Sequence, residues 1–402
     1  MKPLEGYTVV DLTTYVAAPV CARILGELGA RVIKVESPKG DAWRNSSVGF
    51  LPTRFTQEEN PIFDIYNSGK DLISLNLKTP EGMEVMHKLL SKADVFVTNN
   101  RPAALQRLGL SYDQLKEKYP RLVFAIVLGF GEKGPDADKQ AFDTTAFWAR
   151  SGFLQDTAVK NEAYEPVEAP SGVGDSYTGT NLAMQVLAAL MMRDRTGQGQ
   201  CVRASLYHVG AFAMASMTVM SQRPFGVEYP RSRVNSRPFA GSFKCKDGKY
   251  IFLSAAVPLV LEMLGKPELI DDPRFSVENR YKNRELLHQI YKEGFANITL
   301  DEAMEFLKDK DTPTVRLAHF ADVSEDEQAW ANGYVQRVEY PNGNSNVVPS
   351  LPIEMDCMPQ GVTHPTKCLG YDTATVLQEL GYTDQQIQAM AEAGMVLVAA
   401  KQ

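Results

Sequence analysis

The sequence predicts an α/β fold built on a parallel β-sheet, and three observations support this prediction. Short β-branched runs alternate with amphipathic stretches in the first third of the chain, a pattern typical of βαβ units. Several of these runs are apolar along their whole length, as strands covered on both faces of a sheet are. The chain has 402 residues, enough to bury a large core without disulfide or metal support, and typical of two or three domains.

The first βα unit sets the pattern for the elements that follow it. Tyr7–Leu12 is predicted to be a strand and Pro19–Leu28 a helix, with Pro19 in its first turn and Gly29 closing it. The next predicted elements are strands at Arg31–Glu36, Leu72–Leu77, Asp94–Thr98 and Leu122–Leu128, and a helix at Pro80–Ala93.

Charge and cysteine content exclude several functional classes. Lys and Arg number 42 against 49 Asp and Glu, a net charge of −7, which disfavours nucleic acid and membrane surfaces as partners. None of the five cysteines has CxxC spacing. We therefore expect no metal site, no disulfide framework and a cytoplasmic location. The N-terminus has no apolar signal core.

One uncharged stretch, Ala204–Gln222, is about as long as a membrane span. Its apolar residues are mostly small and polar residues interrupt them, so we predict a buried, closely packed helix instead. His208 within it is expected to be a core histidine. Five methionines in helical stretches are also expected in the core: Met191, Met192, Met214, Met217 and Met220.

The turn after the first predicted strand argues against a dinucleotide cofactor. Between Asp11 and Pro19 there is no glycine, so the GxGxxG fingerprint is absent, and the chain has no Walker loop. A nicotinamide cofactor is therefore not expected. A Rossmann-like sheet without this loop says little about function by itself.

Residues 224–323 differ in character and are predicted to form a smaller inserted domain. The region opens with an Arg-rich loop at 229–238 and continues with a hairpin at Phe243–Leu253, whose turn is Asp247–Gly248. Its predicted helices include Arg284–Ala296 and Leu300–Lys308. From Asp326 the strand and helix alternation resumes, and the chain ends in helices at Tyr371–Leu380 and Thr383–Ala393.

The segment 171–179, Ser-Gly-Val-Gly-Asp-Ser-Tyr-Thr-Gly, places a carboxylate ahead of a predicted helix at Asn181–Arg193. On local sequence, Asp175 is expected to be the helix N-cap. The alternative is a carboxylate nucleophile, which the helix N-terminus would keep ionised and which the glycines would let a bulky substrate approach. The two roles do not exclude each other.

Taken with the rest of the chain, this segment resembles the family III CoA-transferases, also called the CaiB/BaiF family, over nearly the whole chain. Seven blocks in order carry the resemblance: Leu4–Leu12 with Ala18-Pro19; Leu28–Asp41; Asn67–Lys70 with Leu75–Leu77; Asn99–Pro102 with Leu108–Leu110; Gly129–Pro135; Gly174–Gly179 with Arg193–Gly199; and Asp326–Trp330 with Val376–Tyr382. Within the family, runs such as Phe142–Phe147 and Glu327–Asn332 are most similar to the branch that acts on 2-hydroxy, aryl or branched-chain acids, including phenyllactate and 2-hydroxyisocaproate.

The resemblance implies a transferase that moves CoA from an acyl-CoA donor to a carboxylic acid acceptor. Asp175 matches the family's catalytic aspartate, which forms a mixed anhydride with the acyl group and then an aspartyl-CoA thioester. Further positions match the family's CoA contacts: Val16 and Ala17 along the pantetheine arm, Asn99 and Asn100 at the adenosine, and Lys70, Arg107 and Lys133 as cations for the phosphates. No metal is implied.

The resemblance also implies a discontinuous architecture. A large Rossmann-like CoA-binding domain would comprise residues 1–222 and 326–402, and a small α+β domain with its linkers residues 223–325. The family forms interlocked homodimers, so the expected partners are a second copy of the chain and the two substrates.

Three departures from the family pattern bear on function. Only Gly241 remains, within 235–242, of the glycine run that forms a lid in some members, and Ser37 replaces an arginine that stacks on adenine.

Acyl-CoA racemases share the fold and use the His of a Gly-His-Asp motif as one of two bases. Here Phe142 stands at that position and cannot move a proton, which favours the transferase over the racemase. A non-catalytic CoA-binding subunit is the remaining alternative. Trp43 is expected either to line an acyl pocket or to anchor its loop.

Overall fold

The computed structural model describes residues 1–44, 56, 59–156, 169–222 and 240–399. The chain divides into two compact units, each considered by itself below. Unit 1 comprises Met1–Thr157, Val167–Thr218 and Asp326–Gln402, and unit 2 comprises Ala158–Pro166 and Val219–Glu325. The Arg-rich loop at 229–238 and residues 235–239 of the expected lid region lie outside the described residues.

Unit 1 is built on a seven-stranded sheet in the order β12-β3-β2-β1-β4-β5-β6. All its neighbours pair in parallel except β12, which runs antiparallel to β3 at the edge. The strands are β1 Thr8–Leu12, β2 Arg31–Glu36, β3 Asp71–Leu75, β4 Val95–Thr98, β5 Val123–Leu128, β6 Cys201–Ser205 and β12 Val396–Leu397. The predicted parallel sheet is confirmed, and β2 has the predicted bounds.

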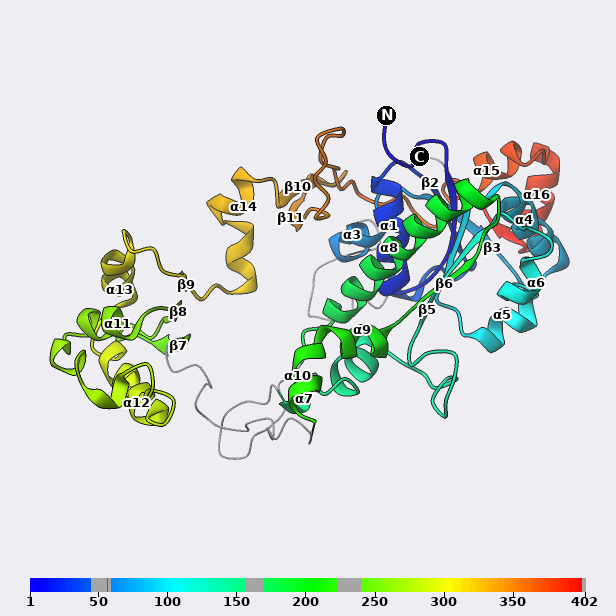
Figure 1. Ribbon diagram of the computed structural model, residues 1–402. Helices are drawn as coiled ribbons and strands as arrows, with labels where there is room; N and C mark the ends of the chain where they lie inside the picture. Colours follow the sequence, from blue (N-terminus) through cyan, green and yellow to red (C-terminus); the bar gives the residue numbers. More distant parts are fainter. Residues whose placement is uncertain (45–55, 57–58, 157–168, 223–239, 400–402) are drawn as a thin grey trace. The chain divides into compact units, whose positions relative to one another are not determined.

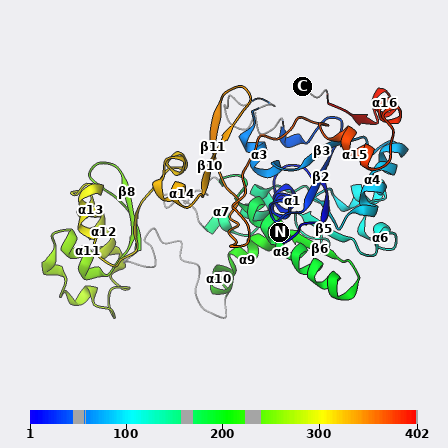
Figure 2. The ribbon, with the colours of Figure 1, turned by 90° about the horizontal axis from the view of Figure 1, so that it is seen from above.

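Side chains of each strand alternate between two apolar cores, because successive residues point to opposite faces of a sheet. One core joins Val10 and Phe96 to helices α4 (Pro80–Lys92), α5 (Pro102–Leu108), α6 (Tyr112–Leu115), α15 (Thr373–Glu379) and α16 (Asp384–Glu392). The other joins Val9 and Val95 to α1 (Ala17–Glu27) and α8 (Val173–Thr196). Figures 1 and 2 show these two helical layers on either face of the sheet.

Helices α1 and α8 pack closely at their N-terminal ends. Gly179 of α8 lies against Ala17 and Val20, and a Cβ at this position would overlap the Ala17 carbonyl oxygen. The glycine therefore lets the start of α8 lie beside the start of α1.

The stretch Ala204–Gln222 is not the single buried helix that its hydropathy predicted. Ala204 and Ser205 belong to β6, and α9 (Leu206–Ala213) and α10 (Ala215–Met220) follow it. His208 and Met220 are exposed, as are Met191 and Met192 on α8, so their expected core positions are wrong in this chain. Met214 and Met217 are half-buried. Among the described residues, no helix is long and apolar enough to cross a bilayer.

The remaining elements of unit 1 connect to the sheet core. They are α3 (Pro61–Asn67), the π-helical turn η1 (Asp143–Ala149), α7 (Phe153–Asp156), α14 (Glu327–Ala331) and the hairpin of β10 (Val335–Glu339) and β11 (Ser345–Pro349). Tyr340, just after β10, donates a 2.7 Å hydrogen bond to the buried Asp64 of α3. The last third of the chain is thereby attached to the first.

Unit 2 has its own core around a three-stranded antiparallel sheet. The predicted hairpin is confirmed as β7 (Ala240–Lys244) and β8 (Tyr250–Ser254), with Gly248 at φ +82° in the turn. The third strand is β9 (Thr314–Arg316), and helices α11 (Val257–Met263), α12 (Arg284–Phe295) and α13 (Leu300–Leu307) pack on the sheet, with short 3₁₀ turns at Pro267–Leu269, Pro273–Phe275 and Phe320–Ser324. The predicted helices at 284–296 and 300–308 are confirmed to within one residue.

Candidate functional site

The topology of unit 1 points to one edge of the sheet. The strand order reverses between β1 and β4, and ligands of open α/β sheets bind outside the carboxyl ends of the strands at such a point. A cavity of about 620 Å³ lies there, lined by residues from the β1–α1 turn, the β4–α5 turn, the end of β5, the segment 137–144 and the start of α8. Five predicted site residues line this cavity: Val16, Ala17, Asn99, Asn100 and Asp175.

Asn99 and Asn100 hold the β1–α1 turn in place. The Asn99 side chain accepts a hydrogen bond from the Thr14 amide at 3.1 Å and donates one to the Thr14 carbonyl at 2.7 Å. Asn100 donates to the Leu12 carbonyl at 3.1 Å. Both asparagines thus have a structural task in addition to facing the cavity.

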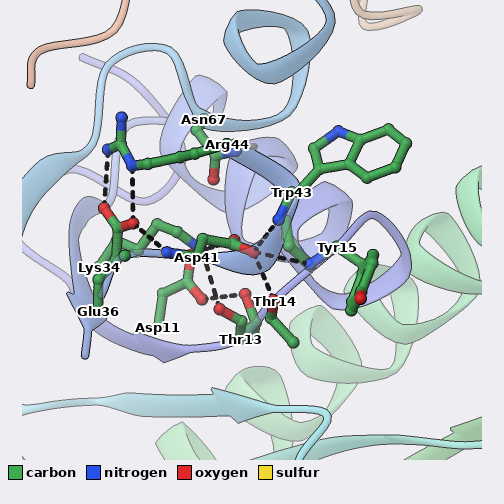
Figure 3. A network of polar contacts seen from close by, with 12 residues as sticks. Asp11, Thr13, Thr14, Tyr15, Lys34, Glu36, Asp41, Trp43, Arg44 and Asn67 are labelled. Carbon is green, nitrogen blue, oxygen red and sulfur yellow. Dashed lines mark hydrogen bonds and ion pairs between the residues drawn. The ribbon is translucent and has the colours of Figure 1, made fainter. Parts of the chain in front are cut away.

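Three buried ion pairs lie behind the same turn, and Figure 3 labels both partners of the Lys34–Asp41 and Arg44–Glu36 pairs. They are Lys34–Asp41 at 2.9 Å, Arg44–Glu36 at 2.8 Å and Lys70–Asp11 at 2.8 Å. The Lys34 ammonium also donates to the Thr13 carbonyl at 3.0 Å. A buried charge must be paired and hydrogen-bonded to be tolerated, so these contacts fix the path of the chain between β1 and α1.

Lys70, which the resemblance places against a CoA phosphate, is enclosed by protein groups in the structure. Its side chain is 1% exposed, and the ammonium donates to Asp11, the Pro19 carbonyl and the Asn67 side chain. Burial lowers the pKa of Lys70 to about 8. With its donors occupied and no access to solvent, Lys70 supports the β1–α1 turn and does not face either cavity.

Asp175 lies in the first turn of α8, three residues after the cap. The N-cap is Gly172, in a left-handed conformation at φ +92°, so the prediction that Asp175 caps the helix is wrong. The helix also begins eight residues earlier than Asn181, at Val173. Burial, and then the nearby Asp143 carboxylate, raise the pKa of Asp175 to about 7. The site therefore holds a carboxyl group whose pKa is raised toward neutral pH.

Asp143 organises the start of α8. Its carboxylate accepts a 2.6 Å hydrogen bond from the amide of Gly172, the N-cap of α8. A Cβ on Gly174 would overlap Asp143 Oδ1 and the Phe147 ring. Gly174 is thus required by packing against η1, where the sequence had suggested room for a substrate. Burial raises the pKa of Asp143, and the hydrogen bond from the Gly172 amide opposes the rise.

Tyr66 of α3 is close to the same helix start. Its hydroxyl hydrogen-bonds with Ser176, and burial, followed by the charge of Asp175, raises the pKa of Tyr66. The phenol is therefore neutral at physiological pH and stands as a hydrogen-bonding group beside the carboxylate pair.

A second cavity, of about 370 Å³, adjoins the first through their common lining residues Thr14 and Asn100. It lies at the carboxyl ends of β1, β2 and β3 and is lined by Ser37, among others. The predicted cations Arg107 and Lys133 are exposed but line neither cavity. The cations that do are Arg101 and Lys139 at the first and Lys78 at the second.

The sequence prediction did not include Tyr15 or Asp143 among the site residues, and it considered Phe142 only as the residue at the position of a racemase base. All three line the cavity that contains Asp175, as does Trp43. The strand-order rule would have indicated Tyr15, which follows β1, and Arg101, which follows β4. No local pattern indicates that Asp143 meets a helix 30 residues away, because this contact depends on the π-helical turn η1, a geometry frequent at functional sites.

Comparison with known proteins gives a consistent result. Residues 4–373 match the family described as CoA-transferase family III. The chain is 37% identical to the (R)-2-hydroxy-4-methylpentanoate CoA-transferase of Clostridioides difficile, with 98% of this chain and 99% of the relative covered. It is 35% identical to the cinnamoyl-CoA:phenyllactate CoA-transferase of Clostridium sporogenes, with coverages of 98% and 97%.

A solved structure shows a similar backbone. The crystal structure of a CaiB/BaiF family protein from Brucella suis superimposes with a TM-score of 0.81 at 27% identity, covering 94% of this chain and 99% of the other.

Proposed function

The chain belongs to CoA-transferase family III, and we propose that it moves CoA from an acyl-CoA to a 2-hydroxy, aryl or branched-chain carboxylic acid, with Asp175 as nucleophile. The observation that carries the proposal is the position of Asp175, at the start of α8 in a cavity at the strand-order reversal. The names of the two relatives above support the acid class, since both act on such acids.

In the proposed reaction, an Asp175 carboxylate oxygen attacks the thioester carbonyl, and the C–S bond breaks. This releases CoA thiolate and leaves a mixed anhydride on the aspartate. The thiolate then attacks the Asp175 acyl carbon, the donor acid leaves, and an aspartyl-CoA thioester remains. The acceptor carboxylate attacks that thioester, and the same steps in reverse deliver the new acyl-CoA and free Asp175. A carboxylate suits this exchange because the anhydride it forms is as activated as the thioester it consumes.

Each tetrahedral intermediate carries an oxyanion that needs hydrogen-bond donors. The start of α1 offers them, because Ala17 and Ala18 have backbone amides that an α-helix does not use internally, and Ala17 lines the cavity. The α1 cap has no side-chain hydrogen bond and its first turn has no acidic residue, so its positive end is not neutralised by its own side chains. We assign the oxyanion contact to these amides.

For CoA, we propose that the pantetheine arm follows Val16 and Ala17 and that the nucleotide lies near Asn99, Asn100 and the second cavity. Arg101, Lys139 and Lys78 line the two cavities and are proposed to neutralise the phosphates, with the exposed Arg107 and Lys133 beyond them. Ser37 in the second cavity leaves room where a longer side chain would stack on the base.

We propose further that the enzyme works in the cytoplasm as an interlocked homodimer. The support is a set of exposed apolar side chains on α8 and α9 that a second copy could cover: Met184, Met191, Met192 and Phe212. The larger unit would then bind CoA in each copy.

The proposed function is tested with cinnamoyl-CoA as donor and 3-phenyllactate or 4-methyl-2-hydroxypentanoate as acceptor, in deuterated water, with mass spectrometry of the acyl-CoA products. We expect the acceptor's CoA ester without deuterium at its α-carbon. In a parallel assay with a saturated 2-methylacyl-CoA, deuterium exchange at the α-carbon without transfer would identify a racemase. Acyl-CoA binding with neither reaction would identify a non-catalytic subunit.

The raised pKa of Asp175 predicts a pH dependence. Attack requires the ionised form, so kcat/KM for the donor should rise with pH and level off above about 7. Asp143→Asn removes a negative neighbour while keeping an oxygen for the Gly172 amide, and should move this rise to lower pH. Asp194→Asn, an exposed carboxylate on the same helix, is the control and should leave the profile unchanged. A profile that is flat from pH 5 to 8 in the unmodified protein would contradict the assignment.

A further inference from the structure

Three aromatic side chains form one wall of the cavity that contains Asp175. Tyr15, Trp43 and Phe142 all line it. The Tyr15 ring lies 6.0 Å from the Trp43 ring, centroid to centroid, and 5.8 Å from the Phe142 ring, which it meets edge to face. Phe142 is 47% exposed, so its ring is available to a bound molecule. We refer to these three residues as the aromatic wall.

The aromatic wall is held by the ion-pair network behind it. Tyr15 has φ +64°, a conformation uncommon for a residue other than glycine. Asp41 Oδ1 stabilises it by accepting a 3.2 Å hydrogen bond from the Tyr15 amide, and accepts a second from the Trp43 amide at 2.9 Å and a third from the Thr14 hydroxyl. Asp41 is itself buried against Lys34. One carboxylate therefore positions two of the three rings, as Figure 3 shows.

The wall stands close to the reacting group. Phe142 lines the same cavity as Asp175 and immediately precedes Asp143, whose carboxylate accepts a hydrogen bond from Gly172, the N-cap of the helix that carries Asp175. An acyl group attached at Asp175 would therefore have its carbonyl at the start of α8 and its side chain within the same cavity as the rings. Such rings offer apolar faces and edges to a phenyl or branched alkyl group, whereas a side chain of one methyl group would leave them uncovered.

Resting on the proposed function, we propose that Tyr15, Trp43 and Phe142 form the subsite for the side chain of the transferred acid, and that Asp41 is its positioning residue. The subsite selects acids with a phenyl or branched alkyl side chain over smaller ones. One methylene group in an apolar pocket changes the ratio of kcat/KM between two substrates by roughly 10–200-fold. An acid with a phenyl side chain should therefore be preferred over lactate by at least that ratio.

The test compares two acceptors that share a carboxylate and a 2-hydroxyl group, 3-phenyllactate and lactate, with cinnamoyl-CoA as common donor. Because a covalent intermediate gives ping-pong kinetics, kcat/KM for the acceptor reports on the second half-reaction alone. Trp43→Ala and Phe142→Ala should each lower the phenyllactate-to-lactate ratio of kcat/KM by about 10-fold or more, with lactate nearly unchanged. Trp43→Leu, which retains part of the apolar volume, should lower the ratio less than Trp43→Ala does. It also covers the case in which the alanine variant folds poorly.

Asp41→Asn should also lower the phenyllactate-to-lactate ratio of kcat/KM. The change should appear as a higher KM for phenyllactate, while kcat for lactate stays the same. A purely structural role would not separate the two acids in this way. Trp330→Ala removes a tryptophan outside both cavities and should leave the ratio unchanged. An unchanged ratio in Trp43→Ala and Phe142→Ala, or an equal loss for both acids, would overturn the aromatic subsite while leaving the transferase intact. If the unmodified protein transferred CoA to no acid, the proposed function would fall, and the subsite with it.

Discussion

Asp175→Asn is expected to lower kcat/KM for CoA transfer by roughly 10³–10⁶-fold, which corresponds to about 4–8 kcal/mol of transition-state free energy. The amide keeps the size of the side chain and its place in the first turn of α8, but it cannot form the mixed anhydride. The measurement is the rate of formation of the new acyl-CoA under saturating and limiting donor. Far-UV circular dichroism and binding of the donor should be unchanged, since the variant removes the reaction and not the site.

Asp194→Asn provides the matched control for this result. Asp194 is an exposed carboxylate near the other end of the same helix and lines neither cavity. It should retain full transferase activity. An Asp175→Asn variant with a loss of only a few-fold would mean that another group forms the covalent bond, or that none does.

Lys70→Met is expected to reduce the free energy of unfolding of unit 1 by about 3–5 kcal/mol, the second large effect. The substitution leaves the buried Asp11 carboxylate without its cation, and an uncompensated buried charge is more costly than the loss of the pair as a whole. The double variant Asp11→Asn with Lys70→Met should therefore be more stable than Lys70→Met alone. Urea unfolding followed by circular dichroism measures the difference, with the unit 2 transition as an internal reference if the two units unfold separately.

Lys88→Met is the control for the loss of a lysine ion pair. Lys88 pairs with Glu84 one helical turn away on the surface of α4, and such pairs contribute well under 1 kcal/mol. If Lys70→Met left the free energy of unfolding unchanged and instead raised KM for acyl-CoA, Lys70 would contact a CoA phosphate, as the sequence resemblance implies. Its proposed role in supporting the β1–α1 turn would then be wrong.

The parallel sheet of unit 1 was predictable because its strands carry strong local signals. Runs such as Arg31–Glu36 and Leu122–Leu128 are continuous and apolar, and the flanking prolines and glycines mark where the helices begin and end. The structure places β2 at the predicted residues and β5 within one residue of them. The hairpin of unit 2 was predictable for a similar reason, since Asp247-Gly248 specifies its turn.

The errors arise where burial depends on partners that a sequence does not name. The length and apolar character of Ala204–Gln222 indicated one buried helix, but β6 takes its first two residues to pair with β5, and α9 and α10 share the rest. Met191 and Met192 have the composition of core residues, yet they lie on the outer side of α8. Hydropathy shows that a side chain is apolar, not whether this chain itself covers it.

The candidate site was predictable in outline only. Resemblance to the family indicated Asp175, and the structure brings Val16, Ala17, Asn99 and Asn100 to the same cavity. The roles of Lys70 and Gly174 could not be read from sequence, because both follow from packing: one ammonium is enclosed by Asp11, and one glycine makes room for Asp143 and Phe147. The pairing of Asp143 with Asp175 likewise depends on the fold of η1.

The central claim, covalent catalysis by Asp175, is tested most directly by trapping the acylated aspartate. The protein is incubated with cinnamoyl-CoA, quenched with hydroxylamine, digested and analysed by fragmentation mass spectrometry. We predict a hydroxamate on Asp175 that forms only in the presence of the acyl-CoA and is missing from Asp175→Asn. No modification in a protein that transfers CoA, or a hydroxamate on another residue such as Asp143, would contradict the mechanism.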